Sequence, residues 1–125
     1  MKTFLLIAVL ALAPLAARAQ PASELELQVV QDIAKCLLTG LPEDWRIAHV
    51  VLELTAPGAD GGEARYVVER GSQAETLVAF APCDTKAPAQ ALIDARARQP
   101  LERRNWKFAH LVLHRDGKFE MKYEY

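Results

Sequence analysis

Two alternating runs near the carboxyl end, separated by a polar break with a glycine, constrain this fold most strongly. The stretch Trp106–Tyr125 contains both runs, and Arg115-Asp116-Gly117 lies between them. Such a pattern is typical of a β-hairpin. A two-residue loop would mix apolar and charged side chains on both faces of the hairpin. A three-residue loop, with Gly117 in the left-handed conformation, separates them. Because a one-residue slip inverts every side chain, we predict the three-residue loop.

This register divides the side chains of the hairpin between two faces. The apolar face joins three pairs: Leu113 with Phe119, Leu111 with Met121, and Ala109 with Tyr123. The opposite face carries mostly polar side chains: His110, Val112, His114, Lys118, Glu120 and Lys122. We therefore expect the first face to form part of the core and the second to lie outside it.

The amino-terminal residues 1–19 have the pattern of a secretory signal peptide. Lys2 gives a positive start, residues 4–17 form an apolar run too short to span a membrane, and Ala17-Arg18-Ala19 is a typical cleavage site. We expect cleavage after Ala19, a periplasmic location and one mature domain over residues 20–125. An uncleaved membrane anchor is the alternative.

The charge balance and the two cysteines bound the function of the mature part. The chain has 15 basic and 16 acidic residues, and the signal peptide removes two basic ones, so nucleic-acid binding is not indicated. Cys36 and Cys83 would meet an oxidising compartment after export, and we predict that they form a disulfide. Two buried free thiols are one alternative. A reactive nucleophile is another, although the sequence shows no low-pKa setting for it.

The first half of the mature chain predicts one helix and three strands. Ser23 and Glu26 form a capping box, and apolar residues recur at helical spacing until Gly40 and Pro42. Alternating segments then predict strands over residues 46–55, 63–70 and 75–81. Because short loops connect these strands, an antiparallel meander is the simplest arrangement.

The second half predicts another helix before the hairpin. Asp84 or Thr85 would cap this helix, Pro88 lies in its first turn, and Pro100 interrupts it before a short turn over residues 101–105. The element order is helix, three strands, helix, two strands. It predicts an α+β domain with a five-stranded, mainly antiparallel sheet and two helices packed on one face.

Few residues have the spacing that catalysis or metal binding requires. His49, His110 and His114 all fall on predicted strands. His110 and His114 share a face but lie about 13 Å apart, at ~3.3 Å per residue, too far to bind one metal ion. Nucleophile elbows and phosphate-binding glycine loops are absent from the sequence. We expect no catalytic site, no metal and no cofactor.

Two further features allow a structural and a functional interpretation. Trp45 and Trp106 each precede a strand, where they would cover the open end of the core or anchor an interface. Residues 53–84 carry a net charge of −4 and residues 86–107 a net charge of +4. These are either solvated faces that roughly cancel or an acidic meander presented to a basic partner.

Motifs at both ends of the mature chain resemble the YezG-like family of bacterial immunity and antitoxin proteins. The first motif is Leu41-Pro42-Glu43-Asp44-Trp45, after the first helix. The second is the carboxyl-terminal stretch, with Trp106, Asp116-Gly117-Lys118-Phe119 and Tyr123-Glu124-Tyr125. The resemblance spans most of the mature chain. It implies a protein without catalysis that binds and neutralises a cognate toxin.

The chain departs from the family in three features. Typical members are cytoplasmic, do not depend on a disulfide, and have a long acidic second helix. Here the chain carries an export signal, and the second helix is rich in alanine and arginine and interrupted by Pro100. An exported protector implies a toxin that acts on the periplasm or arrives through it. The identity of that toxin stays open.

The expected function is therefore a periplasmic immunity protein that occludes a secreted toxin or effector. The alternatives are an inhibitor or binding module for a cell-wall-degrading enzyme, similar to lysozyme inhibitors, and, third, an enzyme. One candidate contact surface is the open sheet face with His110, His114, Glu120 and Lys122, and another is the loop with Asp60 and Glu63. We expect a protein partner, no nucleic acid and, for the mature form, no membrane. The oligomeric state stays open.

Overall fold

The computed structural model describes residues 23–55, 61–71 and 73–125 of the chain. Within these ranges, no helix is long and apolar enough to cross a membrane. The predicted signal peptide, its cleavage site after Ala19, and Asp60 lie outside the described residues.

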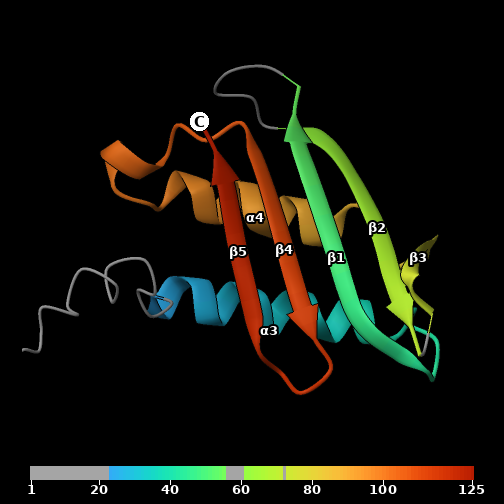
Figure 1. Cartoon of the computed structure of the whole chain (residues 1–125). Coiled ribbons are helices and arrows are strands. Elements are labelled where there is room, and N and C mark those ends of the chain that lie inside the picture. Colours follow the sequence, from blue (N-terminus) through green and yellow to red (C-terminus); the bar gives the residue numbers. More distant parts are fainter. Residues whose placement is uncertain (1–22, 56–60, 72) are drawn as a thin grey trace, which may run out of the picture.

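A five-stranded sheet with both helices on one face forms the body of the molecule (Figure 1). The elements follow the predicted order: α3 (Glu24–Leu38), β1 (Trp45–Leu54), β2 (Gly62–Arg70), β3 (Gln73–Ala79), α4 (Ala87–Ala97), a short 3-10 helix (Leu101–Arg103), β4 (Phe108–His114) and β5 (Phe119–Glu124). The strand order is β3-β2-β1-β4-β5, and every neighbouring pair is antiparallel. The predicted α+β fold is confirmed.

Helix α3 begins at the predicted capping box. The Ser23 hydroxyl accepts a hydrogen bond from the Glu26 amide at 3.1 Å, and the Ser23 amide donates to the Glu26 carboxylate at 3.3 Å. These bonds satisfy two of the amide groups that a helix start leaves unpaired. The helix buries one apolar stripe against the sheet: Val29, Val30, Ile33, Cys36 and Leu37.

The end of α3 is tied to the segment that follows β3. Cys36 and Cys83 form the predicted disulfide, and the Cys83 amide donates to the Cys36 carbonyl at 2.9 Å. A Cβ atom on Gly40 would overlap the carbonyl oxygen of Ala81, so only glycine permits this close approach. The predicted third strand, 75–81, therefore ends too late. Strand β3 ends at Ala79, the Phe80 amide still donates to the Tyr66 carbonyl at 3.1 Å, and the chain then turns toward α3.

Helix α4 begins one residue later than a cap at Thr85 predicts and two residues later than a cap at Asp84 predicts. Lys86 occupies the N-cap position, and Thr85 provides no side-chain cap. The Asp84 carboxylate instead accepts from the amides of Lys86 at 2.7 Å and Ala87 at 3.3 Å. Asp84 was one of the two residues predicted to cap this helix. Its side chain does satisfy unpaired amides at the helix start, but Asp84 lies two residues before the N-cap position.

The carboxyl-terminal hairpin has the predicted register. Leu113 lies opposite Phe119, Leu111 opposite Met121, and Ala109 opposite Tyr123. Gly117 has a φ of +97°, and the Lys118 carbonyl accepts from the His114 amide at 2.8 Å. The glycine therefore supplies the left-handed residue that the three-residue loop needs.

The hydrophobic core lies between the two helices and the face of the sheet on which they pack. Its central strand residues are fully buried, with Val50, Leu52, Ala109 and Leu111 at 0% exposure. Both tryptophans belong to the core, at 8% exposure for Trp45 and 1% for Trp106. The fold therefore supports the interpretation that these two tryptophans cover the core, rather than the interpretation that they anchor an interface.

Candidate functional site on the open sheet face

Both helices lie on one face of the sheet (Figure 1), and the opposite face carries a network of polar side chains. We call it the open face and define it by the outward residues of four strands: Ile47, His49, Val51, Arg65, Val67, Glu69, His110, Val112, His114, Glu120 and Lys122. Strand alternation places these side chains together, because their neighbours in sequence point into the core.

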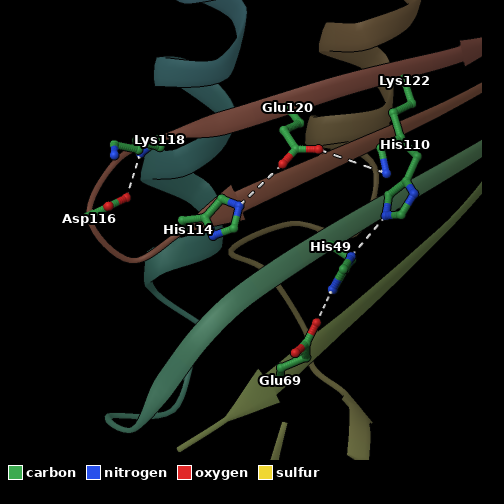
Figure 2. A network of polar contacts seen from close by, with 8 residues as sticks. All are labelled: His49, Glu69, His110, His114, Asp116, Lys118, Glu120 and Lys122. Atoms are coloured by element: carbon green, nitrogen blue, oxygen red, sulfur yellow. Dashed lines mark hydrogen bonds and ion pairs between the residues drawn. The ribbon is translucent and has the colours of Figure 1, made fainter. Parts of the chain in front are cut away.

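Three residues from three strands form a hydrogen-bonded chain on this face (Figure 2). His49 Nε2 lies 3.0 Å from Glu69 Oε2, and His49 Nδ1 lies 2.9 Å from His110 Nε2. The side chains of His49 and Glu69 are only 14% and 18% exposed. Both nitrogens of His49 are thus engaged, and its ring is held in one orientation.

The chemistry of the chain assigns its protons. An ionised carboxylate only accepts hydrogen bonds, so His49 Nε2 carries the hydrogen that faces Glu69. With His49 neutral, its Nδ1 accepts from the Nε2–H of His110, and the remaining lone pair of the chain is at His110 Nδ1. The open face therefore presents an oriented imidazole acceptor at its centre.

The pKa of His110 lies below its ordinary value of 6.5, because burial disfavours the charged ring and a positive charge on Lys122, or on the His49 ring when it is protonated, opposes a second one on His110, while Glu120 acts in the opposite direction. The unfolded chain consequently binds more protons than the folded one between the two pKa values. The contribution of His110 to stability is complete above the pKa that it has in the unfolded chain. It is lost as the pH falls through the lower pKa that it has in the folded protein.

We expect an NMR titration of the His110 ring to give a pKa below 6.5. Unfolding midpoints should also fall as the pH drops below the ordinary value of 6.5, and His110→Gln should reduce that fall because it removes the titrating ring. A His110 pKa at or above the ordinary value, or an identical pH dependence in the variant, would contradict this account of the chain.

A second group of charged side chains lies on β4 and β5 (Figure 2). Glu120 lies 3.8 Å from His114 Nε2 and 3.9 Å from the Lys122 ammonium. The side chains of Glu120 and Lys122 are 58% and 63% exposed. Ion pairs this exposed contribute about 0–1 kcal/mol to folding. Their charges therefore remain available to another molecule at little cost in stability.

Apolar side chains separate these polar groups. Val112 is buried although it points to the open face, where it lies opposite His49 and Glu120. Ile47, Val51 and Val67 are half-buried around the histidines. The combination of an apolar floor and oriented polar groups is typical of protein interfaces.

The structure brings four of the predicted contact residues together, and it places Glu63 on the same side of the sheet, near the start of β2. His110, His114, Glu120 and Lys122 share the open face, as predicted. Glu63 does not lie in a loop, because pairing of β1 with β2 continues to Leu54 and Gly62 and places Glu63 inside β2, opposite Glu53. Asp60 is outside the described residues, so the predicted loop surface is not described as a unit.

The sequence prediction missed the contribution of His49 and Glu69. His49 lies opposite Val67 and Val112, so Glu69 and His110 are its diagonal neighbours on the two adjacent strands. Diagonal neighbours lie within reach of long side chains. Strand alternation is a local signal for the face on which His49 lies, but the pairing of β1 with β4 is a long-range contact that the sequence pattern does not reveal.

The described residues of this face do not form a group that could hold a metal ion. Among the described residues, no group of three or more His, Cys, Asp or Glu side chains is arranged to hold a metal ion. The Glu69–His49–His110 chain uses both His49 nitrogens for hydrogen bonds. What the arrangement offers is oriented donors and acceptors on a surface.

Neither the models of known protein families nor the curated proteins give a match to this chain. Its function is therefore inferred from its own residues and their geometry.

Proposed function

We propose that the protein is a periplasmic immunity protein whose open face binds a cognate secreted toxin and occludes a surface that the toxin needs. The observation that carries this proposal is the open face itself. Within the described residues, the helices cover only the opposite face of the sheet (Figure 1), and the face that these residues leave open combines half-buried valines with the oriented Glu69–His49–His110 chain.

The form of this surface favours a protein partner. Small ligands bind in concave pockets that surround most of their surface. The residues of the open face instead spread across four strands of a sheet, with exposed charges at Glu120 and Lys122. A broad surface with an apolar centre and polar groups around it is suited to a second protein surface of complementary charge.

Two observations outside the open face support the same proposal. The disulfide between Cys36 and Cys83 suits a protein that works in an oxidising compartment. The carboxyl-terminal motif resembles that of YezG-like immunity proteins. Its Gly117 is a turn residue and its Phe119 is half-buried, so the motif supports the fold more strongly than any particular target.

The experiment is a protection assay. We expect deletion of the gene to make cells sensitive to one specific toxin, encoded beside it, and expression of the full-length protein to restore survival. A charge swap on the open face, Glu120→Lys with Lys122→Glu, should fail to protect because it reverses both exposed charges without changing the net charge. The matched control, Asp32→Lys with Lys35→Asp on the exposed side of α3, should protect fully.

Two outcomes would contradict the proposal. A deletion strain that resists every toxin of its sister cells, with no partner recovered, would remove the immunity function. Strong inhibition of a general lysozyme by the purified protein, without any gene-linked toxin, would replace the toxin with a cell-wall-degrading enzyme as the target.

A further inference from the structure

The Glu69–His49–His110 chain ends at His110 Nδ1, a nitrogen that solvent reaches. Among the described residues, the His110 ring forms its one hydrogen bond through Nε2, to His49 Nδ1 at 2.9 Å (Figure 2). No buried side-chain nitrogen or oxygen of these residues lacks a hydrogen-bond partner. His110 Nδ1 is therefore not buried, and with both rings neutral it is a free acceptor.

The contact between the two rings has room for a single hydrogen. If His49 Nδ1 and His110 Nε2 both carried hydrogen, two donors would face each other across 2.9 Å and the bond would be lost. The other nitrogen of His49 already donates to Glu69 at 3.0 Å. While the rings stay in contact, they can therefore take up only one proton between them, and that proton belongs to the pair.

The added proton changes His110 Nδ1 in the same way wherever the charge resides. It arrives from solvent at Nδ1, because this is the one nitrogen of the pair with a free lone pair. The charge then stays on His110, or the central hydrogen moves from His110 Nε2 to His49 Nδ1 and the charge moves with it. In both cases Nδ1 has become an N–H donor.

Charged and titratable groups occupy the register positions around the His110 ring, on its own strand and on the other strands of this side of the sheet. They are His49 and Glu53 on β1, Arg65 and Glu69 on β2, His114 on β4, and Glu120, Lys122 and Glu124 on β5. Burial, a positive charge on His49 and the Lys122 ammonium lower the pKa of His110, and Glu120 raises it. Because the lowering causes outweigh Glu120, the neutral ring with its acceptor is the form present at neutral pH.

We propose that the Glu69–His49–His110 chain is a proton-operated switch of the open face, in which one proton taken up by the two rings converts His110 Nδ1 from a hydrogen-bond acceptor into a donor. At neutral pH, the partner group that bonds to this acceptor is a donor such as a lysine, an arginine or a backbone amide. After the conversion two donors face each other, and the partner is released in acid. This release rests on the function proposed for the open face, whereas the conversion at Nδ1 does not.

NMR of the ring nitrogens tests the conversion in the purified protein, residues 20–125, between about pH 8 and about pH 5, where imidazoles titrate. At the upper end, we expect hydrogen on Nε2 and none on Nδ1 in both His49 and His110. At the lower end, His110 Nδ1 should carry hydrogen, and the two rings together should have gained a single proton. Hydrogen on His110 Nδ1 throughout the range, or a separate proton on each ring, would overturn the proposal.

Proton uptake by two variants gives the matched comparison. His49→Gln keeps an acceptor for His110 and a donor for Glu69 but removes one ring of the pair. Because the pair binds a single proton, this variant should take up as many protons over the same range as the wild-type protein. His114→Gln removes a histidine outside the chain and should take up about one proton fewer. A loss of about one proton in His49→Gln would show that the rings titrate independently, against the proposal.

Release is measured as the dissociation constant for the proposed gene-linked toxin at about pH 7.5 and about pH 5.5. We expect at least about tenfold weaker binding at the lower pH, and a smaller change for His110→Gln, whose amide does not titrate. Equal affinity at both pH values would overturn the release and leave the immunity function in place. The ring NMR needs no toxin, so failure to find one would remove the immunity function and leave the conversion at His110 Nδ1 standing.

Discussion

Replacement of both cysteines, Cys36→Ser with Cys83→Ser, is expected to lower the free energy of unfolding by about 4 kcal/mol, because the disulfide closes a loop across a sequence separation of 47 residues. The bond lowers the conformational entropy of the unfolded chain, because it keeps the loop closed. Folding therefore costs less entropy than it does without the bond. It also holds the last turn of α3 against the segment that leads into α4, where Gly40 packs on Ala81. The loss is a large share of the roughly 5–15 kcal/mol that stabilises an ordinary domain.

The measurement is the thermal midpoint of the mature protein, oxidised and reduced, beside that of the double serine variant. Each kcal/mol shifts the midpoint of a domain of this size by roughly 4–8 °C, so we expect a fall of roughly 15–30 °C. The reduced wild-type protein should resemble the variant, since both lack the cross-link. Equal midpoints for the oxidised and reduced protein, or free thiols in periplasmic material, would contradict the stabilising role of the bond.

Trp106→Ala is expected to lower the free energy of unfolding by about 3–5 kcal/mol, because it removes a large side chain from the core. Trp106 is 1% exposed, and its ring lies 5.4 Å from that of Tyr123. The Arg96 guanidinium lies 5.3 Å from the indole centroid, and the indole N–H donates to the Gln99 amide oxygen at 2.8 Å. The substitution leaves a cavity and also leaves Gln99 without its donor.

Trp106→Phe is the matched control for this prediction. Phenylalanine keeps most of the apolar contact and removes the indole N–H, so its cost should be only about 1–3 kcal/mol. Chemical denaturation of the three proteins measures both differences. An alanine variant with unchanged stability and weakened toxin binding would make Trp106 an interface anchor, which was the functional interpretation of this residue.

Local chemistry explains which parts of the fold the sequence predicts. The capping box at Ser23, the left-handed Gly117 and the alternation through 106–125 each involve residues close together in the chain, and each is found as expected. The register of the hairpin is predictable too, because a two-residue loop would mix apolar and charged side chains on both faces. The disulfide was predicted from the two cysteines of a chain that begins with the pattern of an export signal, and the structure contains it.

Long-range pairing explains the parts that the sequence does not predict. The Glu69–His49–His110 chain requires β1 between β2 and β4, with a particular register on each side. No local pattern encodes that arrangement. Likewise, the early end of β3 follows from the contact of Ala81 with Gly40, which lies in a different part of the chain. The position of Glu63 within β2 follows from continued pairing with Glu53.

The dissociation constant between the purified protein, residues 20–125, and the proposed gene-linked toxin tests the role of the open face most directly. Val51→Lys, at the half-buried centre of the face, and the Glu120→Lys/Lys122→Glu swap should each weaken binding by at least about tenfold with unchanged thermal midpoints, as expected for substitutions inside an interface. The α3 swap, Asp32→Lys with Lys35→Asp, should bind as tightly as the wild-type protein. Unchanged affinity in both open-face variants, or loss of affinity in the α3 variant alone, would contradict the assignment of the open face as the toxin-binding surface.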